Sequence, residues 1–226
     1  MMKKFIHACS SFLFKRNKFR RYLRDRRLCD TTFVALDLEL TSLDADKSQI
    51  TSMGYVVGRA GRMALSSSGY HIIKTNGDLG QSPVIHGLTQ DILAQGEDIA
   101  EALTAISSLF KENILLFHNA RLDLMALNSA FKQCQLPQIE IMYIDTLQLA
   151  LYQLNKQHQV LPNNSATLTV CRQRLDLPVF PAHNALDDAL ATIQLFFAQL
   201  NELGITQEHL LETLLHTKAV GRYQLG

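Results

Sequence analysis

The sequence predicts an α/β protein in which strands come first and strands and helices alternate afterwards. After residues 1–29, a basic amphipathic helix or flexible arm, three short apolar runs precede the next stretch with helical periodicity. Later in the chain, short apolar runs alternate with longer segments whose apolar residues recur every three or four positions, as in amphipathic helices. The chain has 226 residues, of which 47% are hydrophobic. That is enough for a sizeable core in one large domain with an appendage, or in two small domains.

The N-terminal half is expected to contribute three successive strands. Residues 33–39 form a short apolar run that ends in polar turn residues, which is typical of a buried strand. The turn residues at 60–62 separate the next two runs, and residues 77–96 are rich in loop signals. The predicted strands of this half are 33–39, 50–58 and 70–74, and its predicted helix is 97–110.

The C-terminal half is expected to alternate strands and helices and to end in a long helix. Ser165 is expected to cap one of these helices, and Gly204 to end the last. The predicted strands are 113–117 and 140–144, and the predicted helices are 122–131, 146–154, 165–175 and 184–203. The polar stretch 155–164 is expected to be a loop, and residues 206–218 a short helix or tail.

Charge divides the chain unevenly. Residues 1–27 carry ten Lys or Arg and one acid, a net charge of +9, whereas the remainder carries −8. We therefore expect a basic N-terminal extension over 1–29, a globular domain over 30–204 and a short C-terminal segment over 205–226. A basic arm suggests a polyanionic partner, because Lys and Arg release phosphate counterions on binding. A solvated, solubilising tail is the alternative interpretation.

Cysteine usage and hydropathy predict a cytoplasmic protein. The four cysteines are widely spaced and form no C-x-x-C pair. This argues against a zinc site and a disulfide framework and fits a reducing compartment. No apolar run approaches the roughly 20 residues that a membrane span requires, so no membrane association is expected.

Two acidic residues end the first predicted strand. Asp37 and Glu39 are two positions apart, so both side chains project from the same face of the strand. Neighbouring carboxylates repel each other unless a cation neutralises them. Oxygen-only ligands suit Mg²⁺ or Mn²⁺ better than zinc. A solvated strand end is the alternative, because D-x-E alone is a weak signal.

Two further acids and a histidine occur where later helices begin. Asp123 starts a helix that follows a strand, and Asp188 lies near the start of the final helix. His183 precedes Asp188 by five residues, close enough for its side chain to reach over a site that Asp188 helps to form. Each acid alone could simply be a helix N-terminal residue favoured by the dipole. A lone histidine before a helix is more often a surface or capping residue.

Taken together, these residues resemble the DEDDh family of 3′→5′ exonucleases, the group that contains the proofreading epsilon subunit of bacterial DNA polymerase III. The resemblance covers about residues 31–203. The motifs that carry it are D-x-E at Asp37 and Glu39, I-H-G-L-T at 85–89, H-N-A-x-x-D at 118–123, D-T-L at 145–147, and H-x-x-x-x-D at His183 and Asp188. The family has an RNase H-like fold, a mixed sheet flanked by helices, which agrees with the α/β pattern.

The resemblance implies a mechanism that uses two divalent cations, Mg²⁺ or Mn²⁺. Asp37 would bridge both ions, with Glu39 and Asp188 as ligands of one. Asp123 would hold the second through water. His183 would be the general base that deprotonates the attacking water, because imidazole can accept a proton at neutral pH. His183 and Glu39 are thus the residues implied to be catalytic.

The resemblance also implies contacts to the substrate. The loop Ile85-His86-Gly87-Leu88 would pack against the terminal bases, which suits stacking without sequence readout. The family's E-T-T-G pattern is altered here, since Leu40 and Ser42 replace Thr and Gly. The implied substrate-binding residues are Leu40, Thr41, Ile85, His86, Gly87, Leu88, His118 and Asn119. Asp145 is expected to be a helix N-cap instead.

The leading hypothesis is therefore a 3′→5′ exonuclease that acts on single-stranded DNA in proofreading or repair. Its partners would be single-stranded nucleic acid and a polymerase or other replication protein. An RNA-trimming exoribonuclease of the RNase T or oligoribonuclease type is the alternative with the same chemistry, because pocket shape detects the 2′-hydroxyl. A non-catalytic nucleic-acid-binding adaptor is the alternative from another class.

Overall fold

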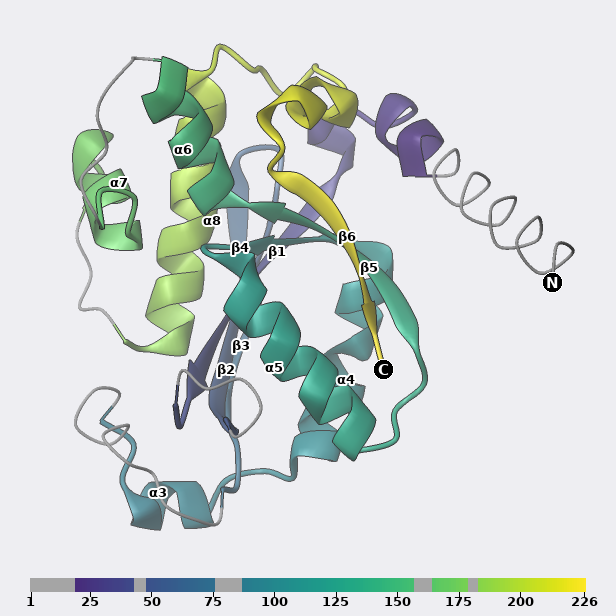
Figure 1. Ribbon diagram of the computed structural model, residues 1–226, viewed down its shortest axis with the longest axis vertical. Coiled ribbons are helices and arrows are strands. Elements are labelled where there is room, and N and C mark those ends of the chain that lie inside the picture. The colour runs from purple at the N-terminus through teal and green to yellow at the C-terminus, as the bar shows by residue number, and fades with distance from the viewer. Residues whose placement is uncertain (1–18, 43–47, 76–86, 157–163, 179–182) are drawn as a thin grey trace, which may run out of the picture.

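A computed structural model of the chain contains one six-stranded mixed sheet (Figure 1). It describes residues 19–42, 48–75, 87–156, 164–178 and 183–226. The strand order is β3-β2-β1-β4-β5-β6. Strands β1, β4 and β5 are parallel, whereas β2, β3 and β6 pair antiparallel to their neighbours. The strands are β1 (Thr32–Leu40), β2 (Ile50–Arg59), β3 (Arg62–Ile72), β4 (Ile114–Phe117), β5 (Ile139–Asp145) and β6 (Val220–Leu225).

Helices cover both faces of this sheet, so the α/β fold and the mixed, helix-flanked sheet implied by the resemblance are confirmed. The helices are α3 (Gln90–Ala94), α4 (Ile99–Glu112), α5 (Ala120–Gln133), α6 (Thr146–Lys156), α7 (Leu168–Arg174) and α8 (Ala185–Glu202). Two 3₁₀ helices, η1 (Leu28–Asp30) and η2 (Leu211–Thr217), are also present, and residues 19–24 are helical. None of the helices in the described ranges is long and apolar enough to cross a membrane.

The alternation of side chains along β1 divides the core into two layers. Val34 and Leu36 pack with buried residues of α4 and α5 on one face. Phe33 and Ala35 pack on the other face with buried residues of α8. Continuing this period of two places Asp37 and Glu39 on the α8 face, at the carboxyl end of the strand. The strand pattern that the sequence predicts therefore fixes the direction of both acids.

Several element boundaries differ from the sequence prediction. Strand β3 begins at Arg62, well before the expected residue 70, and α3 lies within the stretch expected to be loop. The helix expected from Ser165 begins at Leu168, because Thr167 is its N-cap and accepts a hydrogen bond from the Val170 N–H. Ser165 is therefore not the capping residue.

The two terminal segments pack onto the domain. Leu23 and Leu28, inside the expected basic extension, are fully buried. Arg24 pairs with Glu212 and Arg27 with Glu208, both at 2.9 Å. These ion pairs neutralise part of the basic segment within the chain itself. After the short helix η2, β6 pairs with β5 and extends the sheet, which the sequence pattern does not predict.

Candidate active site

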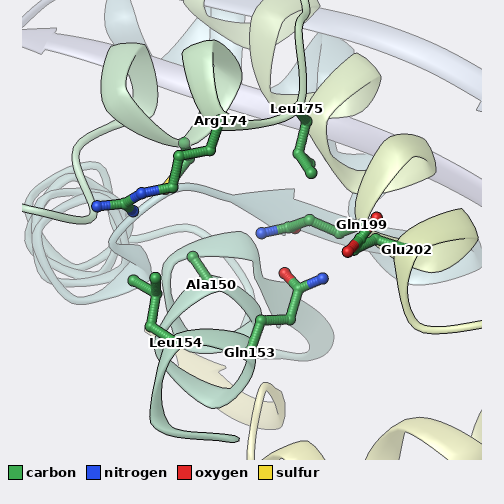
Figure 2. A pocket seen from close by; sticks show the side chains of 8 residues that line it. Ala150, Gln153, Leu154, Arg174, Leu175, Gln199 and Glu202 are labelled. Carbon is green, nitrogen blue, oxygen red and sulfur yellow. The ribbon is translucent and has the colours of Figure 1, made fainter. Parts of the chain in front are cut away.

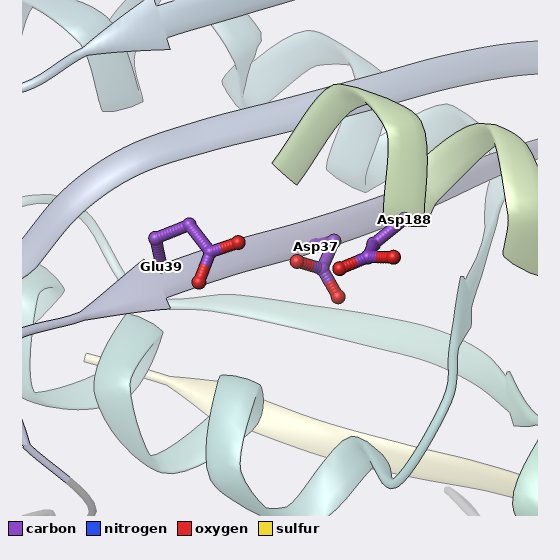
Figure 3. Close-up of side chains that lie close together, drawn as sticks. All are labelled: Asp37, Glu39 and Asp188. Carbon is purple, nitrogen blue, oxygen red and sulfur yellow. The ribbon is translucent and has the colours of Figure 1, made fainter. Parts of the chain in front are cut away.

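Three carboxylates meet at the carboxyl end of β1 (Figure 3). Oxygen atoms of Asp37, Glu39 and Asp188 all lie within 4.8 Å of one another. Figure 3 shows Asp37 between the other two, with Asp188 reaching in from the first turn of α8. The structure thus brings together residues that are about 150 positions apart in the chain.

A glycine allows α8 to come this close to the sheet. Gly54 of β2 is paired directly with Asp37 of β1. A Cβ atom at Gly54 would lie 2.2 Å from the backbone carbon of Ala185 and 2.3 Å from the backbone nitrogen of Leu186. The first turn of α8 therefore rests on the β2 backbone beside Asp37, and any larger residue would collide with it. The sequence pattern does not single out Gly54, because its role depends on a contact between distant segments.

The start of α8 is fixed further by its own cap. The Asn184 side chain accepts hydrogen bonds from the N–H groups of Leu186 and Asp187, at 3.0 and 3.2 Å. Such a cap satisfies N–H groups that have no partner within the helix. Asp188 lies in the first turn that this cap orders.

Asp123 approaches the cluster from the opposite side. It lies in the first turn of α5, and its side chain is buried. Helix α5 follows β4, the parallel neighbour of β1, so its first turn is beside the carboxyl end of β1. The charge of Asp123 is the strongest of the neighbouring charges that raise the pKa of Asp37. Asp123 therefore belongs electrostatically with the three clustered acids.

The environment of these acids disfavours their charged forms. Burial, followed by the charges of Asp123, Asp188 and Glu39, raises the pKa of Asp37 well above its usual range. Burial and then Asp188 raise the pKa of Glu39 to about 7. Burial raises the pKa of Asp123 to about 8, although backbone N–H groups oppose this, and burial also raises the pKa of Asp188. A bound cation would reverse this penalty.

The donor set therefore fits a divalent cation. Oxygen atoms of Asp37, Glu39 and Asp188 are close enough to bind one ion, and the charge of Asp123 raises the pKa of Asp37. All the donors are oxygen atoms, which suit Mg²⁺ or Mn²⁺. Acidic groups that repel one another in a partly buried site are stabilised most strongly by positive charge.

His183 lies beside Asp188, as the sequence spacing predicts. Its backbone N–H donates to Asp188 Oδ2 at 2.9 Å. The residue is exposed, and its φ of 73° belongs to the left-handed region, which is uncommon for residues other than glycine. The backbone bond ties the loop that carries this imidazole to the acidic cluster.

His118 and Asn119 are held by internal hydrogen bonds. His118 Nε2 donates to the carbonyl of Ala166 at 2.9 Å, and Nδ1 lies 2.9 Å from Thr146 Oγ1. Burial lowers the pKa of this imidazole to about 4, so the ring is neutral at pH 7. The backbone N–H of Asn119, at φ 73°, donates to Asp145. Both residues thus stabilise the turn between β4 and α5, the helix whose first turn contains Asp123.

Asp145 caps two helices at once. Its Oδ1 accepts from the N–H of Leu147 at the start of α6, at 2.9 Å. The same carboxylate accepts from Asn119 and Ala120 at the start of α5, at 3.0 and 3.2 Å. The predicted N-cap is confirmed, and the second cap joins α5 to the end of β5.

The remaining residues that the sequence predicts to contact substrate differ in exposure and in their hydrogen bonds. Thr41 exchanges hydrogen bonds with the backbone of Gln49, just beyond the bulge at Leu40. Gly87 is exposed with a φ of 70°, and a Cβ there would meet nothing. Its backbone angle, not a close approach, favours glycine. Leu88 is buried against Leu93. Ile85 and His86 lie outside the described residues.

A separate small cavity lies between α6, α7 and α8 (Figure 2). Its volume is about 260 Å³. Two buried amide atoms, Gln153 Nε2 and Gln199 Oε1, line it without a hydrogen-bond partner. A polar cavity of this kind is suited to ordered water. None of the four acids lines it, so the candidate chemistry belongs to the cluster at β1.

Comparison with known proteins agrees with this geometry. The exonuclease family model named RNase T matches residues 34–196. The DNA polymerase III PolC-type of Thermotoga maritima is 32% identical over 198 residues, which is 85% of this chain and 14% of that protein. The 3′-5′ exonuclease DinG of Staphylococcus epidermidis is 28% identical over 189 residues, 79% of this chain and 20% of that protein. The chain thus spans a small fraction of these relatives' length.

Solved structures share the fold. Exonuclease X in complex with 5′ overhanging duplex DNA gives a TM-score of 0.60 at 20% identity, covering 80% of this chain and 98% of that one. The E. coli ExoI–ssDNA complex gives 0.63 at 18% identity, covering 82% and 43%.

Proposed function

Because this chain belongs to the exonuclease family, we propose that it removes nucleotides from the 3′ end of single-stranded DNA as nucleoside 5′-monophosphates, using two divalent cations. The observation that carries this proposal is the meeting of Asp37, Glu39 and Asp188 within 4.8 Å, with Asp123 acting on the same site. Four carboxylates can offset two divalent cations and still leave room for a phosphate oxygen and a water.

The acids have distinct roles in this proposal. Asp37 would contact both ions, which its position between Glu39 and Asp188 supports. Glu39 and Asp188 would be ligands of one ion, and Asp123 would help to hold the other. When bound, the ions stabilise the charge that develops on the attacking and leaving oxygens of the phosphodiester. The buried walls of the site strengthen these interactions by excluding water.

His183 is the proposed general base. Its backbone bond to Asp188 keeps the imidazole at the rim of the cluster, and its exposure leaves the ring accessible to the attacking water. Imidazole can take a proton from this water and release it to solvent at neutral pH. Both ring nitrogens of His118 have partners within the fold, so this residue has a structural role.

The relatives favour DNA as the substrate. PolC-type proteins are DNA polymerases by name, and both structures described above are complexes with DNA. We therefore propose a role in proofreading or repair inside the cytoplasm, with a DNA polymerase as the partner. The residues proposed to contact the terminal nucleotides are Leu40, Thr41, Ile85, His86, Gly87 and Leu88.

The test is digestion of 3′- and 5′-labelled single strands of DNA and RNA with Mg²⁺ or Mn²⁺. Mononucleotides released from DNA 3′ ends by the native protein, but not by Asp37→Asn or after chelation, support the proposal. Degradation of RNA alone would identify an exoribonuclease. Absence of metal-dependent digestion of both would contradict nuclease activity and leave a binding module.

A further inference from the structure

A second hollow, of about 630 Å³, lies between α5, the end of β5 and the turn that leads into β6. Helix α5 runs beside β6 in Figure 1. We call this hollow the α5–β6 groove. The residues that define it here are Arg121, Met125, Tyr143, Gln148, Lys218 and Tyr223. Arg121 lies two residues before Asp123 in the first turn of α5, and Tyr143 and Tyr223 belong to the face of the sheet that α4 and α5 cover.

The lining of the groove has a net positive charge, because Arg121 and Lys218 outnumber its one acid, Asp145. Arg121 and Lys218 are both exposed, and neither has an acidic partner within the described part of the chain. The one acid in its lining, Asp145, already accepts hydrogen bonds from three backbone N–H groups. In the N-terminal segment, by contrast, Arg24 and Arg27 form ion pairs with glutamates.

Aromatic rings stand between these cations. Tyr143 of β5 and Tyr223 of β6 are half-buried neighbours that project from the same face of the sheet. Tyr143 lies against the backbone of Gly221, where a Cβ would come within 2.4 Å of its ring. This contact fixes the Tyr143 ring, and Tyr223 borders the open groove. Fixed aromatic faces combined with cations are the features by which proteins hold single-stranded nucleic acid without reading its sequence.

We propose that the α5–β6 groove binds the single strand upstream of the 3′ end that occupies the acidic cluster. Phosphates contact Arg121 and Lys218, and a base stacks on Tyr223. This inference rests on the proposed nuclease function for its orientation, but the affinity of the groove for a polyanion does not depend on catalysis.

The central test neutralises both cations in one variant, Arg121→Gln with Lys218→Gln. Each phosphate contact on a single strand contributes about 0.7 to the slope of log affinity against log salt concentration. Removing two contacts should therefore flatten the slope for a labelled 20-nucleotide strand by about 1.4. A matched variant, Arg62→Gln with Lys111→Gln, makes the same charge change at exposed positions on β3 and α4 and should retain the native slope. Measuring anisotropy with Ca²⁺ in place of Mg²⁺ makes this readout independent of hydrolysis.

Kinetics with two substrate lengths tests the direction of the strand. The one internucleotide phosphate of a dinucleotide is the phosphate that is cleaved, so none remains for Arg121 and Lys218. The ratio of kcat/KM for the 20-nucleotide strand to that for the dinucleotide should therefore fall about tenfold in the groove variant. Tyr223→Ala should weaken binding of the longer strand about tenfold, as expected for the loss of one stacked base, and Tyr223→Phe should restore it.

Two results would overturn the inference. One is an unchanged salt slope in the groove variant, or an equal change in the matched control. The other is an equal loss of kcat/KM for both substrate lengths. If the native protein digests neither strand but shows the expected difference in salt slope, the proposed nuclease function fails and the polyanion site stands.

Discussion

Replacing Gly54 by alanine tests whether the contact between α8 and β2 sets the geometry of the acidic cluster. The added Cβ would lie 2.2 Å from the backbone of Ala185, whereas ordinary contact requires at least 3.4 Å. The first turn of α8 and β2 must therefore separate by about 1.2 Å. Asp188 moves with this turn, away from Asp37, which is paired directly with Gly54.

A shift of this size is large for a catalytic site. Misplacement of a reacting group by about 1 Å can cost roughly 10²-fold in rate. We expect Gly54→Ala to lower kcat by about that factor and to weaken Mn²⁺ binding, which titration calorimetry measures without substrate. Overpacking should also lower the free energy of unfolding by about 1–3 kcal/mol.

Gly58→Ala is the matched control. Gly58 lies on the same face of β2, and its added Cβ would meet Ile193 Cδ1 of the same helix at 2.6 Å. Overpacking there is more than a helical turn from Asp188, so stability should fall while Mn²⁺ affinity stays near the native value. Native Mn²⁺ affinity in Gly54→Ala, or an equal loss in both variants, would refute the reasoning.

Three further predictions concern residues around the cluster. His183→Ala should lower kcat by roughly 10²-fold or more while Mn²⁺ binding persists, and unchanged turnover would remove this residue from the mechanism. Burial lowers the pKa of His118 to about 4 in the folded protein, against about 6.5 in the unfolded chain. The neutral ring therefore contributes its full stabilisation above pH 6.5, and this contribution is lost as the pH falls towards 4. Chemical denaturation of native protein and His118→Gln across this range should show a pH-dependent difference of roughly 3 kcal/mol, and parallel curves would contradict the assignment. Arg172→Met should lower the free energy of unfolding by about 3 kcal/mol or more. The reason is that the buried guanidinium donates hydrogen bonds to the carbonyls of Pro178 and Ala191. An unchanged melting temperature would show that these hydrogen bonds contribute little.

The sequence predicts the acidic cluster because local periodicity and motif order determine most of it. The strand period of two directs Asp37 and Glu39 to one face, and that face is the one that α8 covers. The H-x-x-x-x-D spacing likewise predicts that His183 lies beside Asp188, and the backbone bond between them agrees. These relations depend on neighbours in the sequence or on the order of elements.

Other features depend on contacts between distant segments, which local patterns do not encode. The sequence does not distinguish Gly54 from other strand residues, because its role depends on its contact with Ala185. Asp145 was predicted to cap one helix, but its bonds to α5 require β4 and β5 to be adjacent. Strand β6 follows a stretch expected to be a helix or tail, and its pairing with β5 is likewise a long-range contact.

The basic N-terminal segment is predicted to be an amphipathic helix or a flexible arm. In its described part, Leu23 and Leu28 are buried in the domain core. Removing residues 1–27 to test nucleic-acid binding would therefore expose apolar core surface and remove the ion pair between Arg24 and Glu212. Point substitutions of exposed cations are the better probe of polyanion binding.

The most direct test of the account compares two neighbouring acids on α8. Asp188 contributes to the cluster, whereas Asp187, one residue earlier, is not among the three clustered carboxylates. Mononucleotide release from single-stranded DNA should be measured with saturating Mg²⁺ for Asp188→Asn and Asp187→Asn. The account predicts a loss of at least roughly 10²-fold for Asp188→Asn, the scale of removing a group that stabilises developing charge, and near-native rates for Asp187→Asn. Equal rates in the two variants would contradict the assignment of the cluster as the active site.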